Sequence, residues 1–446
     1  MVLPDHIFKA YDIRGLAPDE FDESLAEKIG RAFVTFVKPK RVVIGYDARL
    51  TSPSLAAAVG AGVRRQGADV LELGFSATDY FYYACAVSQS AGLMITASHN
   101  PKDYNGVKLV KKMPFLLSGE EGIKEIKQLV TNNRFPKSRR AGNVQPLDLR
   151  DAYRQYLLAL INPPAIKPFK VVADAANGAA GVFAAAVYAS LPIKLTPLYF
   201  EPDGNFPNHG LDPLKPENRQ ELQARVKAEG ADVGFAFDGD GDRFFVIDDL
   251  GEFVPGDFLT ALLAQVYIKK HPGAAIIYDV RSSWCVKDLI NAAGGRPLMN
   301  RVGHAFIKRR MLKEDAVFGG EVSGHYYFKE FFNADSGLLP SLKVLELLSA
   351  ADQKMSALLA PLRKKYFISG EINLPLTDRM AVTARLKEKY RDGQQYEMDG
   401  LSVEYPDWHF NVRPSNTEPL LRLNLEALKP EILENKKNEL LKLISQ

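Results

Sequence analysis

Three aspartates near the middle of the chain are the residues whose types and spacing point most directly to chemistry. Asp238, Asp240 and Asp242 alternate with glycines in the run DGDGDR, directly after an apolar segment. Carboxylates at this spacing can turn inward around one hard cation, and their oxygens suit Mg²⁺. A calcium-binding EF-hand is excluded because its loop needs Gly at position six and Glu at position twelve, where this chain has Arg243 and Asp249. The run predicts one Mg²⁺ per chain, against the alternative of a polar turn capped by aspartates.

A serine in the run TASHNP, residues 96–101, is the candidate nucleophile. Small Ala97 leaves the hydroxyl of Ser98 accessible, and Pro101 makes the loop rigid. A serine needs activation, and this one does not lie in the G-x-S-x-G elbow of the α/β-hydrolases. Two interpretations remain open: a strand-end turn with local polar caps, and a phosphoryl carrier whose phosphate a carboxylate-bound metal stabilises.

The run RPSNTEP lies between two predicted strands and offers several donors for a phosphate. Arg413 has a forked guanidinium, and Ser415, Asn416 and Thr417 add side-chain and backbone donors. The alternative is a proline-rich hairpin turn without a ligand.

The run GEVSGH carries two groups that suit sugar hydroxyls. Glu321 and Ser323 point the same way on an extended segment, so they could hold adjacent hydroxyls. Arg301, His304 and Lys308 lie just upstream and add cationic groups.

Length, charge and cysteine content limit the class of protein. The chain has 446 residues, and its 57 Lys and Arg against 54 Asp and Glu leave a net charge of +3. This balance argues against a nucleic-acid binder, which usually has a strong basic excess. Cys85 and Cys285 cannot form a disulfide framework, which favours a cytoplasmic protein. The uncharged stretches 80–101 and 175–193 contain polar residues or turn formers, so no membrane span is predicted.

The elements that must position these residues form a repeat. The β-branched runs RVVIGYD (41–47), KVVAD (170–174) and AAIIYD (274–279) each end in Asp and precede a helix-like segment. Strand, helix and strand in this order predict βαβ units with mainly parallel sheets. After about residue 360 the pattern changes to short strands and a final helix, which predicts α+β structure. We therefore expect an α/β fold of three similar α/β/α domains and a smaller α+β domain, over residues 1–146, 147–249, 250–362 and 363–446.

Five runs in order along the chain resemble the motifs of the α-D-phosphohexomutase family, and within it the phosphomannomutase/phosphoglucomutase group. They are YDIRG (11–15), TASHNP (96–101), DGDGDR (238–243), GEVSGH (320–325) and RPSNTEP (413–419). The resemblance extends over the whole chain and implies a heart-shaped enzyme whose four domains each give one loop to a central cleft. Two positions depart from it: Arg281, where many relatives carry Lys, and Asn416, where many carry Gly.

The resemblance also implies roles for individual residues. Ser98 is expected to be the phosphoserine, and one of its phosphate oxygens is expected to join the three aspartates on Mg²⁺. The expected catalytic residues are Ser98, Lys108, Arg243, His325, Arg14 and His99. The expected substrate-binding residues are Tyr11, Arg281, Arg301, His304, Lys308, Glu321, Ser323, Arg413, Ser415, Asn416 and Thr417.

The implied reaction is reversible conversion of hexose 1-phosphate and hexose 6-phosphate, for mannose and glucose, through hexose 1,6-bisphosphate as intermediate and activator. The general base is Lys108 or His325; a histidine titrates near neutral pH, whereas a lysine would need a lowered pKa. Because one phosphate-binding loop must serve two sugar orientations, we also expect the fourth domain to rotate during turnover. The partners expected are small sugar phosphates, with no nucleic acid or membrane, and either a monomer or a dimer. Alternatives are a phosphoglucosamine mutase, a metal-dependent serine phosphatase or hydrolase, and an inactive sugar-phosphate sensor.

Overall fold

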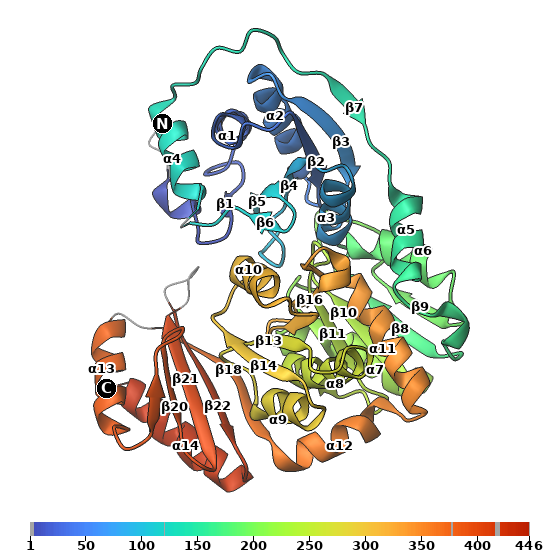
Figure 1. Ribbon diagram of the computed structural model, residues 1–446, viewed down its shortest axis with the longest axis vertical. Coiled ribbons are helices and arrows are strands. Elements are labelled where there is room, and N and C mark those ends of the chain that lie inside the picture. Colours follow the sequence, from blue (N-terminus) through green and yellow to red (C-terminus); the bar gives the residue numbers. More distant parts are fainter. Residues whose placement is uncertain (1–3, 120, 376–377, 415–419, 446) are drawn as a thin grey trace. The chain divides into compact units, whose positions relative to one another are not determined.

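The computed structural model describes residues 4–119, 121–375, 378–414 and 420–445 (Figure 1). It divides into two compact units. Unit 1 comprises Met1–Val254 and Ser323–Met355, and unit 2 comprises Pro255–Val322 and Ser356–Gln446. Within the described ranges, no helix is long and apolar enough to cross a membrane.

The first sheet of unit 1 has a parallel centre and antiparallel strands toward one edge. Its strands are β1 (Ile13–Leu16), β2 (Arg41–Tyr46), β3 (Asp69–Phe75), β4 (Ala91–Ile95), β5 (Tyr104–Lys112), β6 (Phe115–Leu116) and β7 (Val144–Pro146). They lie in the order β1-β5-β4-β2-β3-β7, with β6 beside β5. Strands β4, β2, β3 and β7 run parallel, whereas β5 is antiparallel to both β4 and β1. The segment between β4 and β5 holds the candidate serine.

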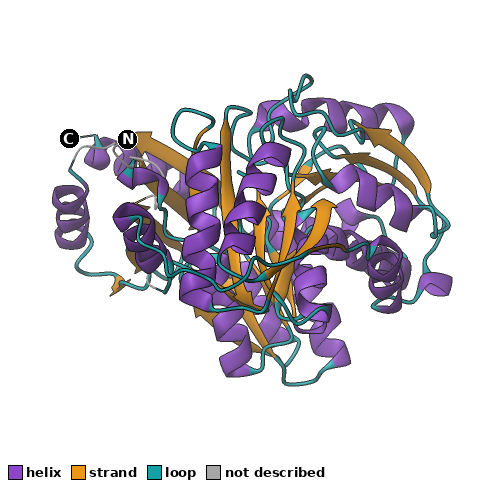
Figure 2. Cartoon of the chain, turned by 90° about the horizontal axis from the view of Figure 1, so that it is seen from above, coloured by secondary structure: helices purple, strands orange, loops and turns teal. Residues whose placement is uncertain are grey.

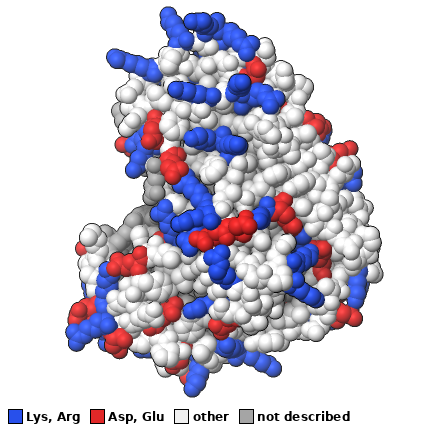
Figure 3. Space-filling model, viewed as in Figure 1, with Lys and Arg blue, Asp and Glu red and all other residues white. Residues whose placement is uncertain are grey.

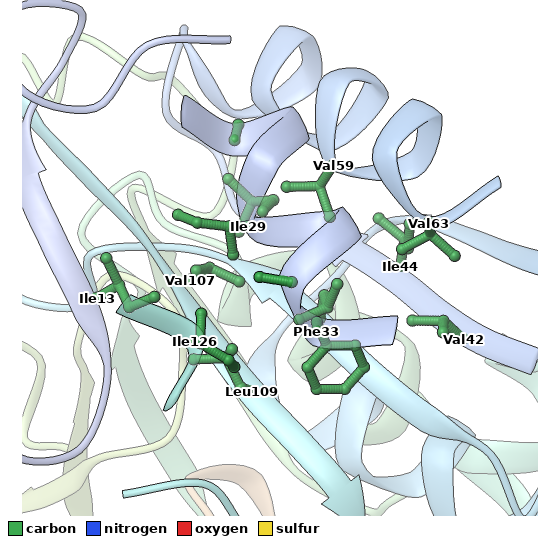
Figure 4. Packing of buried hydrophobic residues seen from close by; sticks show 14 of the residues in the cluster. Ile13, Ile29, Phe33, Val42, Ile44, Val59, Val63, Val107, Leu109 and Ile126 are labelled. Atoms are coloured by element: carbon green, nitrogen blue, oxygen red, sulfur yellow. The ribbon is translucent and has the colours of Figure 1, made fainter. Parts of the chain in front are cut away.

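Helices α1 (Glu23–Val37), α2 (Ser52–Arg65) and α4 (Ile123–Asn132) supply apolar residues to the core of this sheet, while α3 (Thr78–Val87) is buried over most of its length. Asp22 caps α1 by accepting the N–H of Leu25. Ile29 and Phe33, four residues apart on α1, reach the buried cluster drawn in Figure 4. A Cβ at position 30 would lie 2.3 Å from a carbonyl oxygen of α2, so Gly30 allows the two helices to pack closely.

A second sheet completes the α/β part of unit 1. Its strands are β8 (Lys170–Asp174), β9 (Lys194–Leu198), β10 (Val233–Phe237), β11 (Phe244–Ile247) and β12 (Phe253–Val254). They lie in the order β12-β11-β10-β8-β9, and the fully buried β10 is parallel to β8 and antiparallel to β11. The other elements of unit 1 are α5 (Arg150–Ala159), α6 (Ala180–Tyr188), α7 (Gln220–Glu229), the antiparallel pair β16 (Tyr326–Phe328) and β17 (Ala334–Ser336), and α11 (Leu338–Ala351).

Unit 2 combines a parallel and an antiparallel part. The parallel strands β13 (Ala275–Asp279), β14 (Arg296–Asn300) and β15 (Phe318–Gly320) accompany α8 (Gly256–Lys270), α9 (Trp284–Ala292) and α10 (His304–Glu314). Helix α12 (Met355–Lys365) leads to the antiparallel strands β18 (Phe367–Pro375), β19 (Gln394–Tyr396), β20 (Leu401–Glu404), β21 (Trp408–Pro414) and β22 (Leu420–Ala427), with α13 (Arg379–Lys389) and α14 (Pro430–Ile444). The antiparallel sheet has the order β18-β22-β21-β20-β19. The alternation of helices and strands is visible in Figure 2, and it confirms the predicted fold class.

The predicted repeat of strand, aspartate and helix is also present, and each aspartate has the same local role. Each accepts the backbone N–H two residues later: Asp47 from Arg49 (3.1 Å), Asp174 from Ala176 (2.9 Å) and Asp279 from Arg281 (2.8 Å). These turns close the strands β2, β8 and β13. A basic side chain faces each carboxylate: an arginine two residues later in the first and third repeats, and His209, 3.0 Å from Asp174, in the second.

Candidate active site

Asp238, Asp240 and Asp242, which we call the aspartate cluster, lie in the turn between β10 and β11. All three are buried, and one oxygen of each lies within 4.8 Å of the others. The turn comes very close to the serine segment, because a Cβ at position 239 would lie 2.6 Å from the carbonyl oxygen of Ser98. Gly239 therefore allows two segments that are 140 residues apart to meet.

The aspartate cluster fits a hard divalent cation. Burial and the charges of Asp240 and Asp242 raise the pKa of Asp238 well above its ordinary value, since three adjacent carboxylates repel one another. Oδ1 of Asp240 is buried without a hydrogen-bond partner among the described residues. Clustered carboxylates with an unused buried oxygen match the oxygen ligands that Mg²⁺ prefers.

Ser98 faces the aspartate cluster. Its Oγ donates to Oδ2 of Asp238 at 2.7 Å. Nδ1 of His99 lies 3.2 Å from Oγ of Ser98. The serine is 3% exposed and has φ +50°, a left-handed conformation that non-glycine residues seldom adopt. Thr96 accepts its backbone N–H at 2.9 Å. The loop is thus held with the hydroxyl pointing at the carboxylates.

Arg49 holds this loop from its other side, although the sequence analysis did not assign it a role. Its guanidinium donates to the carbonyl oxygens of Ser98 (2.8 Å), Asn100 (2.7 Å), Pro101 (2.6 Å) and Tyr104 (2.9 Å). Nε donates to Asp47 at 3.2 Å, and the side chain is fully buried. Both terminal nitrogens of the guanidinium are therefore used in fixing the loop, while Nε anchors the arginine to Asp47. The available signal was the pattern Asp-x-Arg after a strand, which recurs at Asp279 and Arg281.

Lys108, on β5, occupies the cationic position beside the aspartate cluster. Its Nζ lies 2.7 Å from Asp240 and 2.5 Å from Asp242. Burial alone would lower the pKa of Lys108, but the two carboxylates raise it above its ordinary value. Burial would likewise raise the pKa of Asp242, but Lys108 and His325 hold it well below the ordinary range. In this arrangement the lysine is an ammonium ion that partly neutralises the cluster.

Two histidines flank the same carboxylates. Nε2 of His325 lies 3.4 Å from Asp242, and its Nδ1 lies 2.9 Å from the hydroxyl of Ser323. His99 is different, because burial and the charges of Arg243 and Arg14 hold its pKa well below the ordinary value. His99 is therefore a neutral neighbour of the serine.

Arg14 and Arg243 add positive charge to the serine side of unit 1. Arg14 donates to the carbonyl oxygen of Ala97 at 2.9 Å and to the side chain of Asn100 at 2.6 Å, and Asp12 pairs with it at 2.6 Å. The expected substrate residue Tyr11 is half-buried next to Asp12. Arg243 has a looser ion pair, 3.7 Å from Asp212. Its backbone N–H donates to Asp238 at 3.1 Å, which ties it to the aspartate cluster.

Unit 2 gathers three arginines, Arg281, Arg413 and Arg422, which we call the arginine cluster. Glu371 on β18 lies 3.1 Å from Arg281, 3.7 Å from Arg413 and 3.1 Å from Arg422. Arg281 also pairs with Asp279 at 2.8 Å. Glu371 and Arg422 belong to none of the motifs, so the sequence analysis missed them.

The other predicted residues of unit 2 lie near the start of α10. Buried Glu321 accepts the N–H of Gly303 at 2.9 Å and lies 4.0 Å from Arg281. His304 is the first residue of α10, and Lys308 is a buried residue of the same helix. Arg301 stacks on the ring of Phe306 at 3.1 Å. The pairing of Glu321 with Ser323 on sugar hydroxyls stays a prediction, and Ser415, Asn416 and Thr417 lie outside the described residues.

Surface charge agrees with the absence of a basic excess in the composition. Lys and Arg side chains and Asp and Glu side chains both occur across the face drawn in Figure 3. Among the described residues, the aspartate cluster and the arginine cluster each gather like charge in the interior, which suits small charged ligands.

Comparison with known proteins gives matches along nearly the whole chain. Models of the four domains described as phosphoglucomutase/phosphomannomutase match in order: α/β/α domain I at residues 5–137, domain II at 151–251, domain III at 255–366 and the C-terminal domain at 371–443. A phosphomannomutase of Escherichia coli K12 is 43% identical over 94% of each chain. Phosphohexose mutases of Xanthomonas campestris are 42% identical over 96% of each chain.

Solved structures also match the chain over nearly its whole length. A phosphoglucomutase/phosphomannomutase family protein of Burkholderia thailandensis has a TM-score of 0.91 at 35% identity, covering 98% of this chain and 96% of that one. An N-acetylphosphoglucosamine mutase of Aspergillus fumigatus, solved with glucose 1,6-bisphosphate, has a TM-score of 0.61 at 12% identity, covering 100% of this chain and 96% of that one. The second likeness concerns the fold alone.

Proposed function

The chain belongs to the phosphoglucomutase/phosphomannomutase family, and on that premise we propose that it interconverts the 1-phosphates and 6-phosphates of mannose and glucose. The observation that carries the proposal is the position of Ser98, whose hydroxyl lies 2.7 Å from Asp238 within reach of the aspartate cluster. A serine beside a cation site can hold a phosphoryl group and pass it on. We propose as well that the chain has four domains, over residues 1–146, 147–249, 250–362 and 363–446, and that the enzyme is cytoplasmic.

Phosphorylated Ser98 gives its phosphoryl group to the free hydroxyl of the bound hexose phosphate. The bond from phosphorus to the serine oxygen breaks, a bond to the sugar oxygen forms, and the product is a hexose 1,6-bisphosphate. The other phosphoryl group then returns to the serine oxygen, so each turnover regenerates phosphoserine and releases the isomeric monophosphate. The sugar hydroxyl must lose its proton in the first transfer. Of the two candidate bases, we assign this role to His325, because the two aspartates beside Lys108 raise the pKa of that lysine and keep it protonated.

The residues around Ser98 provide position and charge. Asp238, Asp240 and Asp242 would hold Mg²⁺, which when bound supplies a Lewis acid for phosphoryl oxygens. Arg14, which bonds the serine loop, and Arg243, whose backbone bonds Asp238, would supply positive charge to the transferring phosphoryl group. In unit 2 the arginine cluster would hold the phosphate that does not react, since guanidinium groups bind phosphate with paired donors.

The test is a coupled mutase assay on the wild type and on Ser98→Ala, started with hexose 1,6-bisphosphate. Ser98→Ala should lose turnover, whereas Ser54→Ala, a control at an exposed serine on α2, should keep it. Intact-mass analysis should find one phosphoryl group on the wild type after incubation with the bisphosphate and none on Ser98→Ala. Full activity in Ser98→Ala would refute the role of the serine.

The same assay compares the 1-phosphates of mannose, glucose and glucosamine. Activity that is highest with glucosamine 1-phosphate would replace this proposal with the phosphoglucosamine mutase alternative. Net release of inorganic phosphate without isomerisation would indicate a phosphatase.

A further inference from the structure

The arginine cluster surrounds a carboxylate that the proposed reaction does not use. Glu371 contacts all three guanidinium groups, at 3.1, 3.7 and 3.1 Å, and its side chain is 17% exposed. The cations hold the pKa of Glu371 below its ordinary value even though its burial acts in the opposite direction. The cluster is therefore occupied by an anion that belongs to the chain itself.

The sheet of unit 2 places this carboxylate by its register. Arg413 on β21 is paired with Arg422 on β22, and Glu371 on β18 is paired with Asn424, two residues further along β22. Because side chains alternate between faces, these residues share one face of the sheet. The opposite face packs into an apolar core that includes Phe410, Val412, Leu421, Leu423 and Leu425. Glu371 is thus part of a polar face and cannot leave the arginines without moving the sheet or changing rotamer.

Arg413 has donors that Glu371 does not satisfy. Arg413 is only 3% exposed, yet its Nε has no hydrogen-bond partner among the described residues. Its ion pair with Glu371 is long, at 3.7 Å. Burial and the neighbouring charge of Arg281 lower the pKa of Arg413, which shows how poorly its charge is compensated. A buried guanidinium in this state suits a further anion with several oxygens.

We infer that Glu371 is an internal competitor of the substrate phosphate. When the cluster holds no phosphate, the carboxylate keeps the three guanidinium groups together. When phosphate arrives, the carboxylate competes for the same donors and repels the new anion, which weakens the hold. The inference rests on the proposed function for one step: a bisphosphate that must present both ends to Ser98 has to leave the arginine cluster within each turnover.

Calorimetry tests the competition directly, with glucose 6-phosphate and inorganic phosphate as probes of the full-length protein. Glu371→Gln keeps the shape and removes the charge, so it should lower the Kd for glucose 6-phosphate by about tenfold, because a like charge beside the ligand is gone. Glu371→Asp keeps the charge but retracts it by one methylene. Its Kd for glucose 6-phosphate should therefore lie between the values of the wild type and of Glu371→Gln. Glu388→Gln, at an exposed ion pair with Arg391, is the control and should match the wild type.

Kinetics should change in a way that damage to the fold would not produce. If the phosphate leaves more slowly, both kcat and KM of Glu371→Gln fall together, whereas a disordered site raises KM. An unchanged or raised Kd in Glu371→Gln would overturn the inference, and so would a Kd for Glu371→Asp outside the predicted order. A wild type that binds glucose 6-phosphate but isomerises nothing would refute the proposed function, and the order of Kd values would still decide the role of Glu371.

Discussion

The aspartate cluster of unit 1 and the arginine cluster of unit 2 are built with opposite charges. In unit 1 a cationic side chain, Lys108, pairs with two of the three clustered carboxylates. In unit 2 an anionic one, Glu371, pairs with three guanidinium groups. Lys108 comes from β5 of the other sheet of unit 1, whereas Glu371 comes from β18, which pairs with the strand β22 that carries Arg422. A group of the other sign lowers the cost of gathering like charges inside a protein.

The two clusters differ in how completely that group of opposite sign compensates them. The ammonium of Lys108 lies within 2.7 Å of two aspartates, and Oδ1 of Asp240 still has no hydrogen-bond partner in the described part of the chain. Arg281 has Asp279 as a second partner, but Arg413 lies 3.7 Å from Glu371 and its Nε has no hydrogen-bond partner among the described residues. Unit 1 therefore has capacity for a cation and unit 2 for an anion. This difference suits two tasks: chemistry at the serine, and a reversible hold on a phosphate.

The largest effect should come from removing one charge from the aspartate cluster. Asp240→Asn should lower mutase turnover by about 10³-fold, the scale for losing one preorganised group that stabilises transition-state charge. It should also weaken Mg²⁺ binding, measured by calorimetry. Asp352→Asn, at an exposed pair with Lys167, should change neither quantity. Unchanged Mg²⁺ affinity in Asp240→Asn would show that the aspartate cluster is not the site of the cation.

The next effect should come from the loop behind the serine. Arg49→Lys keeps the charge but cannot reach four carbonyl oxygens and Asp47 at once, because an ammonium lacks the planar fork. We expect kcat to fall by about 10- to 100-fold, the scale for losing a group that orients a functional residue. KM should stay near the wild-type value. Arg65→Lys, at an exposed pair with Glu27, is the control. A rise in KM with kcat unchanged would show that Arg49 acts on binding.

A smaller effect of the opposite kind should follow from weakening the arginine cluster. Arg413→Lys should raise KM for hexose phosphates by about tenfold and lower kcat less, since it removes paired donors and not the reacting groups. Steady-state kinetics of Arg413→Lys would measure the separate changes in KM and kcat, with Arg391→Lys at an exposed ion pair as the control. If kcat fell as strongly as in the unit 1 variants, the proposed division of tasks would be wrong.

The smallest effect concerns pH and one buried carboxyl in each unit. Burial raises the pKa of Asp79 in unit 1 and of Asp257 in unit 2 to about 6, from 3.8. Because the folded state keeps these protons longer than the unfolded state, their contribution to stability falls as pH rises from about 4 to 6 and stays low above that. Two pKa units correspond to about 3 kcal/mol, as an upper value.

Asp79→Asn and Asp257→Asn should therefore each gain stability relative to the wild type as pH rises through that window. Thermal unfolding of the three proteins at several pH values gives this difference. A difference that does not change with pH would mean that the carboxyl has an ordinary pKa in the folded chain.

Much of the site could be predicted from the sequence, because many of its functional residues lie close together in short motifs. The alternation of aspartates and glycines at 238–242 predicts a cation site, and the serine run predicts a nucleophile in a loop after a strand. The recurring strand and aspartate predict three α/β repeats, which the turns at Asp47, Asp174 and Asp279 confirm. Residues two apart on an extended segment point to the same side, so features of this kind depend only on residues that are close together in the sequence.

Arg49, Glu371 and the pairing of Lys108 with the aspartates could not be predicted in this way. An isolated arginine or glutamate is usually a solvated charge, and nothing near Arg49 in sequence shows that it meets carbonyl oxygens about 50 residues away. Strand register brings Glu371 to the arginines, whereas the packing of loops and of two separate sheets brings Arg49 to the serine loop and Lys108 to the aspartates. The sequence by itself determined which chemical groups are present and which turns they form. Only the tertiary structure decided which opposite charge lies inside each cluster, because electrostatic partners are chosen through space in a low-dielectric interior.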